Sequence, residues 1–332
     1  MKMDRSEFVA CGAGRASCRG LSLMSGGLDS QLAVRVLQRA GAEVEGVCFS
    51  TPFFDCAAAK QAAAALGVKL HVVDFLDDEI ALIKNPPHGF GGAMNPCIDC
   101  HATMIRRAGE MMERFGFDFV ATGEVRGQRP MSQNAQSLVT VEKASGLSGR
   151  LVRPLSAKLL EPTIPEKEGL LDREKLLDLS GRGRERQIAL AAEFGIVEYP
   201  SPAGGCKLTE AGFSRKLRDL MEHEGLDDRR LVELSVVARR FRLPDGTSVM
   251  LGRDQRENAI LHGEKGVVIF PVNVAGPTAL LPRVCSDADM ELAKGIVCAY
   301  SRFDRVQGDV ELNVGAVPGP YDREAYRGFQ VC

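Results

Sequence analysis

Apolar segments that alternate with helical patterns between residues 20 and 123 place the strongest constraint on how this chain can fold. Each segment reads as a continuous apolar run rather than an alternating one. Continuous apolar strands are typical of parallel sheets, because helices cover both of their faces. We therefore predict a doubly wound α/β domain, with strands at Leu21 to Met24, Val44 to Phe49, Lys69 to Asp74 and Phe119 to Ala121.

Helical spacing of apolar residues predicts the elements between and after these strands. The helices are expected at residues 30–40, 56–66, 98–115, 174–179, 184–194 and 210–223. A hairpin from Ser137 to Leu155 is predicted inside a connector region that covers about residues 125–170. We expect three parts: an N-terminal extension (1–19), the α/β domain (20–225) and a smaller α+β domain (226–332), which contains a hairpin turn at 241–247.

We expect the chain to be cytoplasmic and to have no general electrostatic attraction for a polyanion. The net charge is −2, and no segment reaches the roughly 18 apolar residues that a membrane span needs, so we expect no membrane partner. Any contact with RNA therefore requires a local basic patch. In a reducing compartment cysteines do not form a disulfide framework. Seven of them lack ligand spacing and are expected to be free thiols or small buried residues: Cys11, Cys18, Cys48, Cys56, Cys285, Cys298 and Cys332.

The segment Ser25-Gly-Gly-Leu-Asp-Ser30 lies directly between the first predicted strand and the first predicted helix. Gly26 and Gly27 allow several backbone N–H groups to point at one anion, and the helix N-terminus adds partial positive charge. The hydroxyls of Ser25 and Ser30 can donate to phosphate oxygens, and Asp29 can bind Mg²⁺. The plainer alternative is a strand-to-helix turn with a serine cap.

This loop resembles the PP-loop of the ATP pyrophosphatase superfamily. It lacks the Lys-Ser/Thr ending of a Walker loop, which favours cleavage of ATP between its α- and β-phosphates. The resemblance implies ATP and Mg²⁺ as cofactors, and contacts to adenine and ribose from Phe49, Ser50 and Asp55. For Asp55, a plain helix N-cap is an equal alternative.

Three further cysteines have chemically suggestive surroundings. Cys97 and Cys100 form a Cys-x-x-Cys pair at the predicted start of a helix, where the helix dipole favours thiolate. Cys206 ends the distant segment Ser201-Pro-Ala-Gly-Gly-Cys206, in which glycines permit close approach by a bulky partner. Alternatives are a structural zinc site, which would be one ligand short, and a redox dithiol.

Together these segments resemble the tRNA-specific 2-thiouridylases (MnmA type) and the ThiI-like PP-loop proteins over roughly residues 20–220. The likeness rests on the PP-loop, Asn95-Pro-Cys-Ile-Asp-Cys100, Ala121-Thr-Gly-Glu124 and Cys206. It implies Cys100 and Cys206 as the catalytic pair, with Asp29 in the reaction and Gly123 at the nucleotide. It also implies that Cys97, Cys100 and Cys206 could bind a [4Fe-4S] cluster. The sequence departs from the family at Thr122-Gly-Glu-Val125, where Thr-Gly-His-Tyr is common.

The last hundred residues resemble the RNA-binding C-terminal domain of NFACT-type proteins, around Leu251-Gly-Arg-Asp-Gln-Arg-Glu-Asn258. A structural or dimerisation domain is an equal alternative, because acids and bases are about equally common there. If RNA binds, the candidates to contact phosphate are Arg239, Arg240, Arg242, Arg253 and Arg256. Arg182-Gly-Arg-Glu-Arg186 is a second basic patch, with a solvated helix start as its alternative.

The function that the resemblance implies is ATP-dependent thiolation of a tRNA uridine through an adenylated intermediate. Sulfur would be carried by a cysteine persulfide or by a [4Fe-4S] cluster. The expected partners are tRNA and a sulfur donor, which is a cysteine desulfurase, a sulfur carrier or inorganic sulfide, and a homodimer is allowed. Two other functions remain open: a PP-loop ligase that forms amides, and a non-catalytic nucleotide- or RNA-binding protein. The sequence does not distinguish the 2-thio from the 4-thio product.

Overall fold

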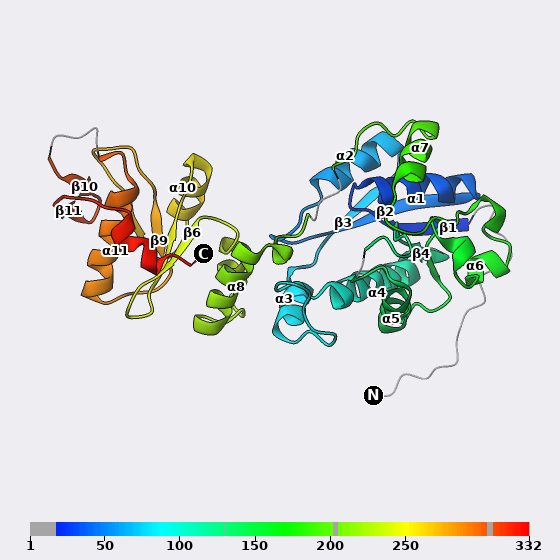
Figure 1. The fold of residues 1–332 in the computed structure, drawn as a ribbon, viewed down its shortest axis with the longest axis horizontal. Coiled ribbons are helices and arrows are strands. Elements are labelled where there is room, and N and C mark those ends of the chain that lie inside the picture. Colours follow the sequence, from blue (N-terminus) through cyan, green and yellow to red (C-terminus); the bar gives the residue numbers. More distant parts are fainter. Residues whose placement is uncertain (1–17, 130, 202–204, 304–307, 332) are drawn as a thin grey trace. The chain divides into compact units, whose positions relative to one another are not determined.

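The computed structural model describes residues 18–129, 131–201, 205–303 and 308–331, and it divides into two compact units (Figure 1). The first unit is Met1–Gly205 and the second is Cys206–Cys332; each is described by itself. Most of the predicted extension 1–19, with Cys11, lies outside the described residues, as does Cys332. None of the helices in the described part of the chain is long and apolar enough to span a membrane.

The first unit is built on a five-stranded sheet in the order β3-β2-β1-β4-β5, with every pair parallel. This arrangement confirms the predicted doubly wound α/β fold. The strands are β1 (Cys18–Leu23), β2 (Ala42–Ser50), β3 (Leu70–Asp74), β4 (Phe119–Ala121) and β5 (Leu151–Val152). The helices are α1 (Leu28–Arg39), α2 (Ala57–Leu66), α3 (Leu76–Lys84), α4 (Cys97–Phe115), α5 (Ala135–Ser145), α6 (Ile164–Lys167) and α7 (Glu185–Glu193).

Helices cover both faces of this sheet, as Figure 1 shows, with α1, α2 and α7 on one face and α3, α4 and α5 on the other. Each face has its own apolar core. Leu32 and Val36 of α1 belong to the first core, whereas Ile105 and Met112 of α4 pack in the second. Burial on both faces explains why the strands are continuously apolar in sequence.

Two predicted elements between residues 137 and 179 are wrong. The predicted hairpin at 137–155 is instead α5 followed by β5, because the Asn134 side chain accepts from the Ser137 N–H (2.8 Å) and caps the helix. The predicted helix at 174–179 is only a 3₁₀ turn, η2 (Arg173–Lys175). It ends there because Leu177 N donates to Pro154 O (2.9 Å) and Leu179 N to Leu155 O (2.7 Å), which holds this segment extended.

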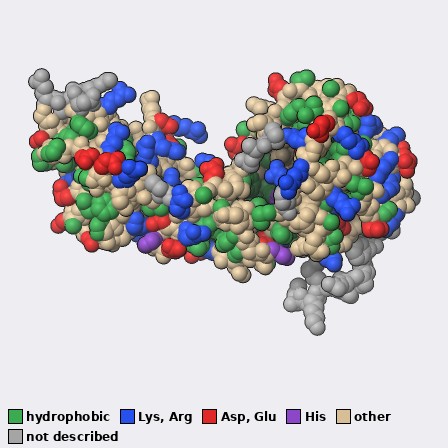
Figure 2. Space-filling model, viewed as in Figure 1, with side chains coloured by type: hydrophobic (Ala, Val, Ile, Leu, Met, Phe, Trp, Pro, Cys, Tyr) green, Lys and Arg blue, Asp and Glu red, His purple; other side chains and the backbone are tan. Residues whose placement is uncertain are grey.

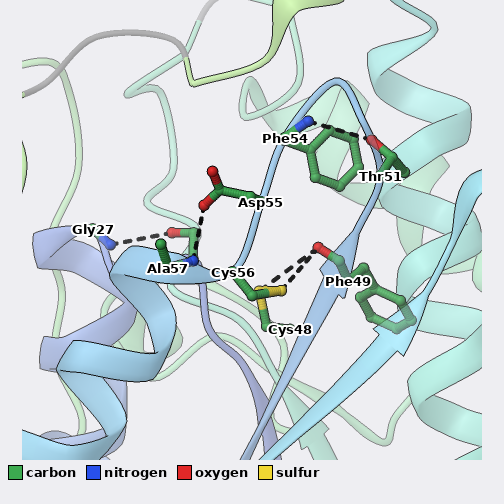
Figure 3. Close-up of a disulfide and its surroundings, with 9 residues drawn as sticks. Gly27, Cys48, Phe49, Thr51, Phe54, Asp55, Cys56 and Ala57 are labelled. Atoms are coloured by element: carbon green, nitrogen blue, oxygen red, sulfur yellow. Dashed lines mark hydrogen bonds between the residues drawn. A yellow bond between two sulfur atoms is a disulfide. The ribbon is translucent and has the colours of Figure 1, made fainter. Parts of the chain in front are cut away.

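Cys48 and Cys56 form a disulfide, so the expectation that both stay free thiols is wrong (Figure 3). The chain folds back between them through a turn in which Thr51 N donates to Phe54 O (2.9 Å). This turn brings the end of β2 beside the start of α2, with the two Cα atoms 6.0 Å apart. The pairing depends on the shape of that turn, which ligand spacing in the sequence does not reveal.

The second unit is α+β, as predicted, and contains a four-stranded antiparallel sheet in the order β6-β7-β9-β8. The predicted hairpin turn at 241–247 is confirmed, since it joins β6 to β7. The strands are β6 (Arg239–Arg242), β7 (Ser248–Leu251), β8 (Val267–Ile269), β9 (Ala279–Leu281), β10 (Val310–Leu312) and β11 (Gly315–Val317). The helical elements are η3 (Lys207–Thr209), α8 (Ala211–His223), α9 (Arg229–Leu234), α10 (Gln255–His262), α11 (Asp287–Tyr300) and η5 (Glu324–Phe329).

Helix α8 belongs to this second unit, so the structural division falls earlier than the domain boundary expected at residue 225. The reason is a network of ion pairs between the end of α8 and β6. Arg240 contacts Asp219 and Glu224 at 2.6 Å each, and Arg242 contacts the same two carboxylates at 2.7 Å. Burial alone would raise the pKa of Asp219, but the two arginines hold it below its usual range. We call these four residues the α8–β6 network.

The substitution Arg240→Met is expected to destabilise the second unit by about 3 kcal/mol, because buried carboxylates lose a partner. Hydrogen–deuterium exchange at the β6 and β7 amides should become faster in this variant. Arg229→Met is the matched control: its pair with Glu233 is solvent-exposed and should contribute only about 0–1 kcal/mol. Equal exchange rates in both variants would show that the network does not hold α8 in place.

Candidate active site

The candidate site lies at the carboxyl edge of the parallel sheet, where β1 and β4 are neighbours. The chain leaves β1 toward β2 on one side of the sheet and later returns to β4 on the other side. This point, where the chain connections reverse direction, is the usual ligand position in such folds. The predicted nucleotide loop, residues 25–30, follows β1, and the segment 122–128 follows β4.

The nucleotide loop has the backbone shape that its glycines predict. Gly26 has φ +80°, and a Cβ there would lie 2.3 Å from the backbone carbon of Ala58 in α2. Only glycine fits this position, on both conformational and steric grounds. Gly27 N donates to Ser25 Oγ (3.3 Å), and Ser30 Oγ donates to Gly27 O (2.8 Å). The loop thus turns tightly into α1, with Ser25 exposed at its outer side.

Gly123 fixes the distance between the nucleotide loop and the turn after β4. A Cβ at Gly123 would lie 2.7 Å from Asp29 C, Asp29 O and Ser30 N, so only a bare backbone can approach α1 this closely. The role of Gly123 at the nucleotide stays a prediction. The close packing against Asp29 is by itself a structural reason for glycine at this position.

The carboxylate of Asp29 is suited to act as a ligand of Mg²⁺. Its Oδ2 accepts from Gln128 Nε2 (2.9 Å), whereas its Oδ1 is buried and has no hydrogen-bond partner among the described residues. A buried, unpaired carboxylate oxygen is costly unless something binds it. Mg²⁺ prefers such oxygen ligands and commonly bridges them to phosphate. Gln128 also has a buried, unpaired Oε1, again among the described residues, which adds a second oxygen beside Asp29.

The residues predicted to bind adenine and ribose have different surroundings. Phe49 is 4% exposed and packs edge-on against Phe75 (5.3 Å between ring centroids), so its side chain belongs to the core. Ser50 ends β2, and its carbonyl accepts from Phe75 N (3.0 Å). Asp55 Oδ1 accepts from Ala57 N (2.8 Å), the first residue of α2, although the N-cap position itself is Cys56 (Figure 3). Of the three predicted residues, the partly exposed Ser50 and the exposed Asp55 can therefore face a nucleotide with their side chains.

The paired cysteines lie in the first turn of α4, as predicted. Cys97 Sγ accepts from Asn95 Nδ2 (3.0 Å), and Cys100 Sγ donates to Glu79 Oε2 (3.1 Å). Glu79 comes from α3 and is 1% exposed. Burial raises the pKa of Glu79 to about 7, although the Cys100 hydrogen bond and the charge of His101 oppose this change. A carboxyl group that titrates near neutrality thus contacts one of the candidate sulfur-carrying thiols.

Glu124 connects the thiol-bearing end of α4 to the turn after β4. Its carboxylate accepts from His101 Nδ1 (3.2 Å), from Arg153 Nε (2.9 Å) and from Thr122 Oγ1 (3.1 Å). Burial alone would raise the pKa of Glu124, but His101 and Arg153 lower it to about 2. The departure from Thr-Gly-His-Tyr therefore has a structural explanation: Glu124 positions His101, which directly follows Cys100.

These contacts form a continuous path from the thiols to the nucleotide loop within the first unit. His101 contacts Glu124, Glu124 follows Gly123, and Gly123 packs on the backbone of Asp29. Two residues on or beside this path, Glu79 and Gln128, were missed in the sequence. Glu79 occupies the apolar face of α3 between Leu76 and Ile83, and an acid in that pattern was the signal that could have identified it.

Cys206 belongs to the second unit, where its carbonyl accepts from Thr209 Oγ1 (2.7 Å) in η3. Residues 202–204 of the predicted glycine loop lie outside the described residues. Within the described residues, no three His, Cys, Asp or Glu side chains gather as metal ligands. The three-thiol site and the catalytic pair of Cys100 with Cys206 therefore stay predictions.

The arginines proposed to contact RNA differ in how much of their side chain is engaged. Arg240 and Arg242 are held in the α8–β6 network, and Arg239 lies over the Tyr300 ring (5.3 Å). Arg253 pairs with Glu257, whereas Arg256 is exposed.

In the second basic patch, Arg186 pairs with Asp178 (2.6 Å), and the adjoining Gly181 N donates to Arg126 O (2.8 Å). That patch therefore borders the loop that contains Gln128.

Comparison with known proteins gives two family matches on different parts of the chain. Residues 15–158 match the model of the thiamine biosynthesis protein (ThiI), and residues 238–325 match the model of the NFACT protein RNA-binding domain. Among curated proteins, a tRNA-specific 2-thiouridylase MnmA from Sulfurimonas denitrificans is 37% identical over 30% of this chain and 32% of its own length. A probable tRNA sulfurtransferase from Anoxybacillus flavithermus is 28% identical over 42% of this chain and 35% of its own length.

The chain thus spans about a third of the length of these curated relatives. Among solved structures, a 4-thiouridine synthetase–RNA complex with bound ATP is 20% identical, with a TM-score of 0.38, over 66% of this chain and 53% of that one. Both family matches overlap the segments whose resemblance was predicted from motifs. The chain therefore combines a region that matches the ThiI family with a region that matches the NFACT RNA-binding domain, which confirms the predicted family resemblance.

Proposed function

We propose that this chain is an ATP-dependent sulfurtransferase that thiolates a uridine in tRNA. The observation that carries the proposal is the path from Cys100 through His101, Glu124 and Gly123 to Asp29, which links a thiol pair to a nucleotide loop. The matches to the ThiI family model and to proteins named tRNA sulfurtransferase and 2-thiouridylase support it. An amide-forming ligase would leave these thiols without a role.

In the proposed reaction, the uridine carbonyl oxygen attacks the α-phosphorus of ATP and displaces pyrophosphate. The backbone N–H groups of Gly26 and Gly27 and the start of α1 bind the departing phosphates. Asp29 would hold Mg²⁺, which neutralises phosphate charge when bound. The product is an O-adenylated uridine, from which AMP leaves with the carbonyl oxygen when a sulfur nucleophile adds to the same carbon.

We propose that the sulfur reaches this carbon by way of Cys100 and Cys206. In a persulfide route, the terminal sulfur of a Cys206 persulfide attacks the carbon, and AMP departs. The Cys100 thiolate then attacks the Cys206 sulfur, which releases the thiolated base and leaves a Cys100–Cys206 disulfide for an external dithiol to reduce. In the alternative route, Cys97, Cys100 and Cys206 would hold a [4Fe-4S] cluster, which supplies an open iron for a sulfur donor. The presence of Cys97 favours the cluster, because the persulfide route needs only two thiols.

The partners in this proposal are tRNA and a sulfur donor, and the reaction takes place in the cytoplasm, where tRNA is modified. The target base must leave its stack to reach the carboxyl edge of the parallel sheet. The two basic patches and the region that matches an RNA-binding domain are the surfaces that could position the tRNA.

Asp29→Asn should reduce thiouridine formation by at least about a hundredfold, since even indirect partners of a metal ligand contribute about 10–100-fold. The assay incubates the full chain with tRNA, Mg-ATP and sulfide, and measures thiouridine, AMP and pyrophosphate by mass spectrometry. Asp172→Asn is the control, because Asp172 lies at the far end of α1, where its N–H donates to Ala40 O (3.2 Å). Formation of AMP without any thiouridine in the unmodified chain would contradict the proposal.

Anaerobically purified protein should contain about four irons and four sulfides per chain, with visible absorption that the Cys97→Ala, Cys100→Ala, Cys206→Ala triple variant loses. Iron-free protein that thiolates tRNA would refute the cluster and leave the persulfide route. Iron-free, inactive protein that holds zinc would refute sulfur transfer in favour of a structural metal site.

A further inference from the structure

The second unit contains a cationic pocket that no predicted function explains. It has a volume of about 340 Å³ and is formed by four segments of the second unit. The segments are the η3–α8 region, the turn between α9 and β6, the loop between β7 and α10, and residues 330–331. They contribute charged side chains at Lys207, Glu210, Arg215, Lys216 and Arg253, and less polar walls at Phe213, Val236 and Val331.

Positive charge exceeds negative charge in this pocket. Four of its lining residues are cations and one, Glu210, is an anion. Arg253 is engaged with Glu257, and Lys216 Nζ donates to Ala238 O (3.2 Å). Lys207 and Arg215 form no ion pair among the described residues. The Arg215 guanidinium lies over the first turn of α8, since its Nη2 would be 3.9 Å from a Cβ at Gly212. The pocket thus offers cationic groups to an anion beside a helix N-terminus.

Contacts with β6 hold two of the segments that line the pocket. The α8–β6 network fixes α8, and with it Arg215 and Lys216, against the sheet. The end of the chain is held on the same strand, because Val331 N donates to Arg240 O (2.9 Å) and Gln330 bridges to Phe241. Two of the walls, α8 and residues 330–331, therefore depend on β6.

The lining favours a phosphate over a base. Its one aromatic residue, Phe213, is only 8% exposed, so it offers no ring face for a base to stack on. Lysine and arginine side chains around an open pocket are the usual contacts to a nucleic-acid backbone. The pocket begins at Lys207, directly after Cys206, and extends to Arg253, which lies inside the region matched by the RNA-binding domain model.

We propose that this pocket binds a backbone phosphate of the tRNA substrate and so holds the RNA beside Cys206. The identity of the ligand rests on the proposed function. Most of the cations lie on η3 and α8, outside the segment 238–325 that matches the RNA-binding domain, so they extend that surface toward the thiol. The second unit would then carry both the RNA contact and one of the sulfur-carrying residues.

The test measures tRNA binding by the full chain over a series of KCl concentrations, using fluorescence anisotropy. Lys207→Ala and Arg215→Ala should each weaken binding several-fold and lower the magnitude of the log K against log salt slope by about 1, as expected for one lost phosphate contact. Arg218→Ala is the matched control, because Arg218 is exposed on the same helix but does not line the pocket. This variant should leave the slope unchanged.

Equal slopes in all three variants would overturn the proposal, and so would the absence of tRNA binding by the unmodified chain. Calorimetry with inorganic pyrophosphate tests whether the pocket binds a free anion instead of an RNA phosphate. If Arg215→Ala abolishes pyrophosphate binding but leaves tRNA binding intact, the pocket binds a free anion and the proposal fails. The proposed function is tested separately. If the chain thiolates tRNA but Lys207→Ala and Arg215→Ala leave the salt slope unchanged, only the pocket proposal fails. If these two variants lower the slope but the unmodified chain does not thiolate tRNA, only the proposed reaction fails.

Discussion

The close approach between Gly123 and the backbone of Asp29 is the constraint on which the rest of the candidate site depends. It exists because β1 and β4 are neighbours in a parallel sheet, so the loops that follow them meet at one edge. The same turn after β4 carries Glu124, which fixes His101, and Gln128, which binds Asp29. One short segment thus joins the nucleotide loop to the thiol-bearing end of α4.

Much of this arrangement could be predicted from local patterns. Four strands and the helices around them follow from continuous apolar runs and helical spacing, and Ser25 to Ser30 could be placed because position between a strand and a helix is part of the motif. The hairpin prediction at 137–155 failed because this segment begins with a helix, which the Asn134 side chain caps and which buries Leu138 and Val141 on one face. Residues such as Glu79 and Gln128 were missed because their roles come from contacts with distant parts of the chain.

The division of the chain shows the same limit for domain boundaries. Helix α8 follows the first domain in sequence, yet Asp219 and Glu224 pair with Arg240 and Arg242 of the second unit. Long-range ion pairs of this kind leave no periodic signal in the sequence. They also engage Arg240 and Arg242, which were expected to contact RNA. Lys207 and Arg215, which line the cationic pocket, are not part of these ion pairs. The predicted site residues are therefore divided between two units, with the nucleotide loop and Cys100 in one and Cys206 in the other.

The central claim is that ATP activates the uridine oxygen, and the fate of that oxygen tests it most directly. A tRNA labelled with ¹⁸O at the carbonyl to be replaced would be thiolated with ATP and a sulfur donor in unlabelled water. The account predicts that the label appears in AMP, in equal amount to the thiouridine formed. Label in water or in pyrophosphate, or formation of ADP in place of AMP, would contradict the adenylated intermediate and with it the role assigned to the loop at Ser25 to Ser30.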